Sequence, residues 1–152
     1  MRQRAVNRRE ESIIMDYSLI NIKTISADCM GALSFFEGTH DVAFEIKRIY
    51  YIHDVPKGVQ RGGHAHIRLR QILFCPYGSI EIILDDGVEK CSVLLDDPGK
   101  GLIIGPGLWR EMIWHQENAV LCVGASEYYD EKDYIRDYDD FLRYVKEVKL
   151  HG

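Results

Sequence analysis

Most of the chain alternates hydrophobic and polar residues with a period of two, which is the pattern of half-buried β-strands. These segments end at turn signals such as Asp85-Asp86-Gly87, where glycine supplies the positive φ of a tight hairpin. The predicted strands are Tyr17–Thr24, Ala43–His53, Gln71–Cys75, Ser79–Leu84, Glu89–Leu95 and Ala119–Ala125. Short strands at this spacing, without alternating helices, predict an all-β sandwich or small barrel.

After residue 130 the hydrophobic period changes to that of a helix. Asp130 is placed to cap a first turn, and apolar residues then recur at helical spacing: Tyr134, Tyr138, Phe141, Val145 and Val148. We therefore predict one amphipathic C-terminal helix from about Asp130, docked with its aromatic face against the β core. No repeat or linker divides the chain, so residues 15–152 are predicted to form one domain.

Length and charge narrow the classes of function. The chain has 152 residues and 17.6 kDa, a usual size for one domain. It carries 19 Lys and Arg against 24 Asp and Glu, a net charge of −5. That balance argues against nucleic-acid and membrane-surface partners, which need a basic face. It does not exclude a small anionic ligand held by a few arginines.

The first 14 residues differ from the rest in charge. They hold Arg2, Arg4, Arg8 and Arg9, but they lack the apolar run of a signal peptide. We interpret residues 1–14 as a disordered or misassigned extension, with Met15 as a plausible start. No stretch approaches the roughly 20 apolar residues that span a bilayer.

The cysteines indicate a reducing compartment. Cys29, Cys75, Cys91 and Cys122 are scattered, without a Cys-x-x-Cys pair. A disulfide framework or a zinc site needs closer pairing or histidines at ligand spacing. We predict reduced thiols and a cytoplasmic protein.

The chemistry-bearing segment is Arg61-Gly62-Gly63-His64-Ala65-His66. Two histidines at i and i+2 on extended backbone point to the same face. The glycines before them allow backbone or ligand to approach closely. Such a pair also occurs by coincidence on solvated strands, but here an arginine precedes it and an apolar strand follows. The arrangement predicts an anion or sugar pocket at the mouth of the β structure.

The spacing of these histidines matches half of a metal-site pattern. His64, His66, position 71 and Gly78 are in the register of the first cupin motif, but position 71 is Gln where an anionic ligand is expected. The second motif, from Gly101, has Arg110 or Glu111 where the metal-binding histidine belongs. Two histidines and an amide beside an arginine make a poor site for a divalent metal. We therefore predict no metal and no cofactor.

Several segments in the same order resemble one family. They are IKRIYYIHDVPKG, RGGHAH, ILDDG, GPGLWREM and ASEYYDEKDYIRDYDDF. They resemble the cupin-fold 3,4-ketoisomerases, which act on dTDP-4-keto-6-deoxyglucose in making 3-amino-3,6-dideoxyhexoses for surface polysaccharides. The resemblance covers residues 18–146. It implies a double-stranded β-helix (jelly roll), a homodimer paired through its N-terminal strands, and a thymidine diphosphate anchor, without a metal.

The resemblance also implies catalytic roles. The RGxH element is similar to that of dTDP-sugar 3,5-epimerases, where this histidine removes a proton beside the 4-ketone. By that analogy His64 is the base for the C3 proton, and His66 moves a proton between the oxygens or to C4. Tyr50 shares a strand face with Arg48 and Ile52, so it is a candidate to hydrogen-bond the keto or hydroxyl oxygen. Core packing is the alternative reading of Tyr50.

Five further residues are candidates for substrate binding. Arg48 and Arg61 suit a diphosphate, because a guanidinium matches phosphate oxygens bidentately. Gln71 either orients a histidine, bonds a sugar hydroxyl or is merely structural. Trp109 lines the pocket or packs in the core. The fifth is Arg110.

Position 110 bears on the product. In the resembled family, enzymes that leave the C4 hydroxyl in the galacto or the gluco arrangement differ here by His or Arg. Arg110 therefore favours the gluco product, although Met30, at the other associated position, fits neither group. The alternatives to a ketoisomerase are a dTDP-sugar 3,5-epimerase and a non-catalytic or metal-dependent cupin that binds a small molecule.

Overall fold

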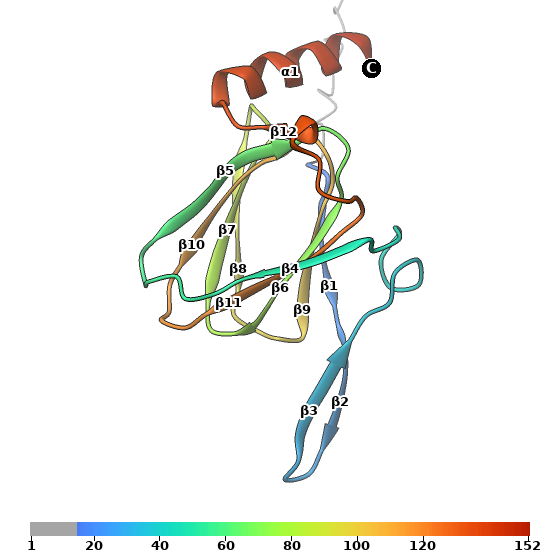
Figure 1. Cartoon of the computed structure of the whole chain (residues 1–152), viewed down its shortest axis with the longest axis vertical. Helices are drawn as coiled ribbons and strands as arrows, with labels where there is room; N and C mark the ends of the chain where they lie inside the picture. Colours follow the sequence, from blue (N-terminus) through green and yellow to red (C-terminus); the bar gives the residue numbers. More distant parts are fainter. Residues whose placement is uncertain (1–14) are drawn as a thin grey trace, which may run out of the picture.

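Two five-stranded antiparallel sheets face each other in the computed structural model, which describes residues 15–152 (Figure 1). In sheet order, the first contains β1 (Tyr17–Asn21), β9 (Lys100–Ile104), β6 (Gln71–Tyr77), β11 (Val120–Ala125) and β4 (Arg48–Ile52). The second contains β12 (Tyr134–Ile135), β5 (Gln60–His66), β10 (Trp109–Trp114), β7 (Ile80–Asp85) and β8 (Lys90–Leu95). The prediction of an all-β double-stranded β-helix with a C-terminal helix is confirmed.

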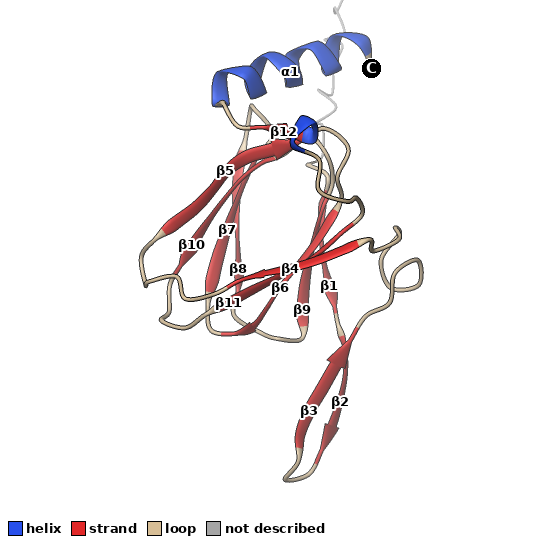
Figure 2. Cartoon of the chain, in the orientation of Figure 1, coloured by secondary structure: helices blue, strands red, loops and turns tan. Residues whose placement is uncertain are grey.

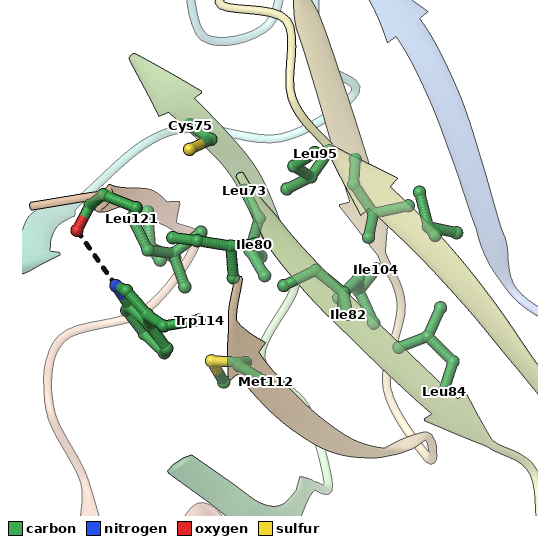
Figure 3. Packing of buried hydrophobic residues seen from close by; sticks show 14 of the residues in the cluster. Leu73, Cys75, Ile80, Ile82, Leu84, Leu95, Ile104, Met112, Trp114 and Leu121 are labelled. Atoms are coloured by element: carbon green, nitrogen blue, oxygen red, sulfur yellow. Dashed lines mark hydrogen bonds between the residues drawn. The ribbon is translucent and has the colours of Figure 1, made fainter. Parts of the chain in front are cut away.

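The apolar core lies between the two sheets (Figure 3). Strand β7 shows how the sequence builds it, since Ile80, Ile82 and Leu84 are fully buried and alternate with more exposed residues. Trp114 is fully buried in this core, and its Nε1–H donates to the backbone oxygen of Ala119 at 2.9 Å. The period-two pattern in the sequence therefore corresponds to one buried face on each strand.

The predicted N-terminal strand is divided in two. Strand β1 pairs with β9, whereas β2 (Lys23–Ala27) leaves the barrel and pairs with β3 (Gly31–Phe35). The β2–β3 hairpin projects away from the rest of the molecule (Figure 2). The predicted strand at 43–53 is shorter than expected, because only Arg48–Ile52 pairs with β11.

Five strands lie outside the predicted set, namely β3, β5, β9, β10 and β12. Strand β5 begins with polar residues and glycines, and β10 carries Arg110 and Glu111, so neither has a simple alternating pattern. These two strands pair with each other, and β10 also pairs with β7. Their extended form depends on partners distant in sequence.

The C-terminal prediction is wrong about where the helix begins. Asp130 caps a single 3₁₀ turn, Glu131–Asp133, and Tyr134–Ile135 then pairs with β5 as strand β12. The helix α1 spans Tyr138–His151 and is capped by Asp137, whose side chain accepts from the backbone N–H of Asp140. Strand pairing opposite Ala65 and His66 outweighs the local helical pattern in this segment.

Helix α1 packs across one end of the barrel (Figure 1). Phe141 is fully buried and clusters with Ala65 and Trp109. Among the described residues, none of the helices is long and apolar enough to cross a bilayer. Residues 1–14, interpreted above as an extension, lie outside the described part of the chain.

Phe141 anchors the helix, so Phe141→Ala is expected to lower the free energy of unfolding by about 3 kcal/mol. The matched change Val148→Ala, at a half-exposed position of the same helix, is expected to change it by less than about 0.5 kcal/mol. Urea unfolding followed by circular dichroism measures both. Equal effects of the two substitutions would contradict this account of how the helix is held.

Candidate active site

A cleft of about 290 Å³ opens between β4 and β5, where the two sheets diverge. Four of the predicted site residues line it: Arg48, Tyr50, Arg61 and His64. Arg48, Tyr50 and Ile52 share the inner face of β4, as predicted, while Ile49 and Tyr51 are exposed. The cleft therefore brings the β4 residues together with the histidine segment.

Strand β5 is distorted just before the histidines. Gly62 and Gly63 both have positive φ, and a Cβ on Gly62 would lie 2.8 Å from the backbone oxygen of Arg110. Pairing with β10 shifts here, so that Arg110 lies opposite His64 while Glu111 lies opposite Gly62. The two glycines thus permit a bulge that sets the position of His64 in the cleft.

The two histidines share a side of the strand but differ in access. Their rings are 5.0 Å apart and nearly perpendicular. His64 lines the cleft, whereas His66 is fully buried and is not among the residues that line it. Among the described residues the Nε2 of His66 has no hydrogen-bond partner, so a proton-transfer role for His66 beside His64 stays a prediction.

His66 is held by a buried carboxylate. Its Nδ1 lies 3.1 Å from Oδ2 of Asp133. The same carboxylate accepts from the backbone N–H of Arg68 at Oδ1 and from that of Leu69 at Oδ2. A carboxylate acceptor at Nδ1 places the imidazole proton there and leaves Nε2 as an acceptor. Asp133 is absent from the predicted site, because no motif links residues 67 positions apart.

Both imidazoles are neutral at ordinary pH. Burial, followed by the positive charge of Arg110, lowers the pKa of His64 to about 4. The same two causes lower the pKa of His66 to about 2. A neutral imidazole accepts protons, so His64 is suited to act as a base in the cleft.

Arg110 and Gln71 lie behind the cleft. Arg110 is fully buried, and its guanidinium donates to Oε1 of Gln71 at 2.5 Å and to the backbone oxygen of Leu108 at 3.0 Å. Burial lowers the pKa of Arg110 to about 10, so the side chain is charged at neutral pH. The Nε2 of Gln71 in turn donates to the hydroxyl oxygen of Tyr50 at 2.9 Å. Gln71 therefore contacts a tyrosine, whereas the sequence left open a histidine, a sugar hydroxyl or a merely structural role.

The segment after β11 adds three unpredicted residues to the cleft, namely Tyr129, Tyr134 and Arg136. The ring of Tyr134 lies 5.3 Å from that of His64, and the Arg136 guanidinium lies 4.2 Å from the centre of the Tyr134 ring. The sequence pattern placed Tyr134 on the buried face of a helix. Only the pairing of β12 with β5 brings it to the histidines.

Trp109 does not line the cleft. It precedes Arg110 on β10 and therefore points to the other face of the sheet, where its ring lies 5.2 Å from Tyr138 and 5.6 Å from Phe141. Of the two sequence-based readings of Trp109, packing fits this position and substrate contact does not.

Within residues 15–152, no group of three or more His, Cys, Asp or Glu side chains is arranged to hold a metal ion. Gln71, at the position of a carboxylate ligand in the metal-site pattern, is engaged by Arg110 and Tyr50. A donor set of two imidazoles beside a buried guanidinium does not fit a divalent cation. Independence from metals and cofactors stays a prediction.

Comparison with known proteins identifies close relatives. The family model FdtA, described as WxcM-like, C-terminal, matches residues 15–146. The chain is 44% identical over 136 residues to a TDP-4-oxo-6-deoxy-alpha-D-glucose-3,4-oxoisomerase of Aneurinibacillus thermoaerophilus, and the match covers 90% of this chain and 97% of that protein.

Solved structures agree in fold and sequence. A histidine-to-asparagine mutant of the 3,4-ketoisomerase QdtA from Thermoanaerobacterium thermosaccharolyticum, in complex with TDP-4-keto-6-deoxyglucose, is 46% identical with a TM-score of 0.85, covering 89% of this chain and 97% of that one. The TDP-quinovose 3,4-ketoisomerase WlaRB from Campylobacter jejuni is 43% identical with a TM-score of 0.81, covering 86% and 99%. The chain therefore belongs to the FdtA family of WxcM-like proteins.

Proposed function

We propose that this protein is a metal-independent isomerase that converts TDP-4-keto-6-deoxyglucose into the corresponding 3-keto sugar nucleotide. The observation that carries the proposal is the meeting of a neutral imidazole, His64, and a phenol, Tyr50, from opposite sheets in one arginine-lined cleft. Relatives at 43–46% identity that are named as 3,4-ketoisomerases support it.

The reaction moves one hydrogen from C3 to C4 and one proton from the C3 oxygen to the C4 oxygen. His64 takes the proton from C3, which is acidic because it is adjacent to the C4 carbonyl. The electron pair forms the C3–C4 double bond, and the C4 oxygen gains a proton to give an enediol. Loss of the C3 hydroxyl proton then forms the C3 ketone, while protonated His64 gives a proton to C4 and returns to its neutral form. No oxidant or reductant enters this balance.

Tyr50 is the better candidate for the proton on oxygen. Tyr50 lines the cleft, whereas His66 is buried and bound to Asp133. We therefore assign Tyr50 to the substrate oxygens and His66 to supporting the wall of the site. The buried charge of Arg110 favours negative charge on an oxygen held near Tyr50.

Arginines suit the diphosphate of the substrate. Arg48 and Arg61 line the cleft as expected, and Arg136 adds a third guanidinium. Arg136 is bound to Glu131 through two contacts, Nε to Oε1 at 2.6 Å and Nη2 to Oε2 at 3.0 Å. We assign Arg48 and Arg61 as the main phosphate ligands, since a guanidinium pairs well with phosphate oxygens.

The same proposal includes the configuration of the product at C4 and the reaction that would consume the product. Arg110 favours the gluco arrangement at C4, and the relative named for TDP-quinovose, a 6-deoxyglucose, supports this assignment. A 3-keto sugar nucleotide is the form that an aminotransferase requires to make a 3-amino-3,6-dideoxyhexose. We place this step in the cytoplasm, where all four cysteines would stay reduced.

A homodimer is part of the proposal. Every residue of the β2–β3 hairpin is exposed, and a lone two-stranded hairpin is marginally stable in water. A groove of about 640 Å³ between the hairpin and the first sheet is lined by Ile22, Phe36, Ile49 and Phe74. A second copy that covers the hairpin and this groove would bury these apolar surfaces.

Turnover in heavy water tests the function. When the protein is incubated in heavy water with TDP-4-keto-6-deoxyglucose and EDTA, we expect the 3-keto isomer to appear in the NMR spectrum. His64→Ala should lower kcat at least about 10³-fold, because the base is lost, while TDP binding persists. The control His115→Ala, at a partly exposed histidine paired with Glu81, should stay near wild type. Exchange at C3 and C5 without keto migration would indicate a 3,5-epimerase, and inertness a binding protein.

The pH dependence of kcat/KM tests the state of His64. Because its pKa in the folded protein is about 4, below the usual 6.5, the imidazole stays neutral until the pH falls near 4. Activity should therefore persist below pH 6 and fall by half near pH 4, with circular dichroism reporting that the fold is intact. Half-loss near pH 6.5 in a folded protein would contradict a buried, neutral base.

Light scattering tests the dimer. The wild type should have the mass of a dimer at micromolar concentration, and Leu33→Glu should shift it towards the monomer, because Leu33 is 59% exposed on the hairpin. Val88→Glu, at an exposed residue in the turn between β7 and β8, should remain dimeric. A monomeric wild type would refute the dimer without affecting the catalytic proposal.

A further inference from the structure

A chain of three polar side chains crosses the interior of the barrel behind the cleft. Arg110 comes from β10 in the second sheet, whereas Gln71 and Tyr50 come from β6 and β4 in the first. Arg110 is fully buried and Gln71 is 1% exposed, while Tyr50 reaches the cleft. The cleft is thus connected to a buried positive charge through a single amide.

The chemistry of these groups determines the direction of each hydrogen bond. A guanidinium has only donors, so it can bind Gln71 only through the amide oxygen. The Nε2 group must then face Tyr50, and the phenol oxygen accepts from it at 2.9 Å. A phenol has one proton, and this contact does not use it. The Tyr50 O–H is therefore available to a ligand in the cleft.

We propose that Gln71 is a positioning residue that holds Tyr50 as a hydrogen-bond donor to the substrate oxygen, with Arg110 determining the orientation of the amide. This inference rests on the proposed function, since it assigns Tyr50 to the substrate oxygens. It also gives a reason for an amide at position 71. A glutamate there would bind Arg110 equally well, but it has no donor and would turn the Tyr50 proton away from the cleft.

The same contact favours proton release from Tyr50. Burial raises the pKa of Tyr50, while the charge of Arg110 and the hydrogen bond from Gln71 oppose that rise. When Tyr50 gives its proton to a substrate oxygen, the donor from Gln71 remains on the phenolate oxygen. Gln71 thereby stabilises both the starting and the deprotonated form in one orientation.

The substitution Gln71→Glu tests the proposal, because it keeps the size and the contact to Arg110 and replaces the donor with a negatively charged acceptor. The expected result is a fall in kcat of about 30-fold or more, with KM changed less than about 3-fold and an unchanged melting temperature. Gln116→Glu makes the same chemical change at an exposed position and should match the wild type. Gln71→Met, which also lacks the donor, should show the same loss of kcat if the glutamate variant does not fold.

A double-mutant cycle separates positioning from a general structural role. If Gln71 acts through Tyr50, Gln71→Glu should add less than about 3-fold to the loss of kcat already caused by Tyr50→Phe. Losses that multiply in the double variant would overturn the proposal, because Gln71 would then act independently of the phenol. Unchanged kcat in Gln71→Glu would overturn it as well.

A spectroscopic measurement distinguishes failure of this inference from failure of the proposed function. The ¹³Cζ resonance of Tyr50, assigned by its loss in Tyr50→Phe, reports the hydrogen bonds of the phenol without any turnover. Gln71→Glu should shift this resonance, and Gln116→Glu should leave it in place. An unshifted resonance refutes the contact even if the enzyme is an isomerase. A shifted resonance in a protein that does not isomerise the substrate refutes the proposed function alone.

Discussion

The hydrogen bond between His66 and Asp133 joins the two parts of the chain that build the site. Asp133 also accepts from the backbone of Arg68 and Leu69, so one carboxylate binds the last residue of β5 and two backbone donors in the turn after it. These contacts hold the segment after β11 against β5, where Tyr134 pairs opposite His66. Together with the pairing of β12 and β5, they place Tyr134 and Arg136 at the cleft.

One buried cation, Arg110, lies behind the cleft and acts on the groups that line it. Within residues 15–152, the hydrogen bonds of Arg110 go to the neutral oxygens of Gln71 and Leu108, and none goes to a carboxylate. A buried charge without a carboxylate partner is costly, but its charge adds to the effect of burial in lowering the pKa of both histidines, which keeps them neutral. The apolar core around Ile82 and Trp114 reaches the cleft at Met112, and Tyr50 and Ile52 also pack against this core.

Sequence reasoning succeeded where a pattern is local. Alternation along β7 and β8, the Asp-Asp-Gly turn between them and the shared face of Arg48 and Tyr50 all follow from residues near one another in the chain. It was wrong at Tyr134, where helical spacing is present but pairing with β5 decides the conformation. It also left open whether Trp109 lines the pocket or packs in the core, because the sequence alone does not show which face of β10 is covered by helix α1.

By itself, the sequence determined the all-β class, the RGGHAH element and the presence of an amide in place of an acidic ligand at position 71. The family resemblance then selected the double-stranded β-helix and the chemistry. Only the tertiary structure decided that His66 is buried on Asp133, that Gln71 bridges Arg110 to Tyr50, and that the segment 129–136 completes the cleft. The physical reason is that these contacts join residues far apart in the chain, whose approach depends on strand pairing and packing rather than on local propensity.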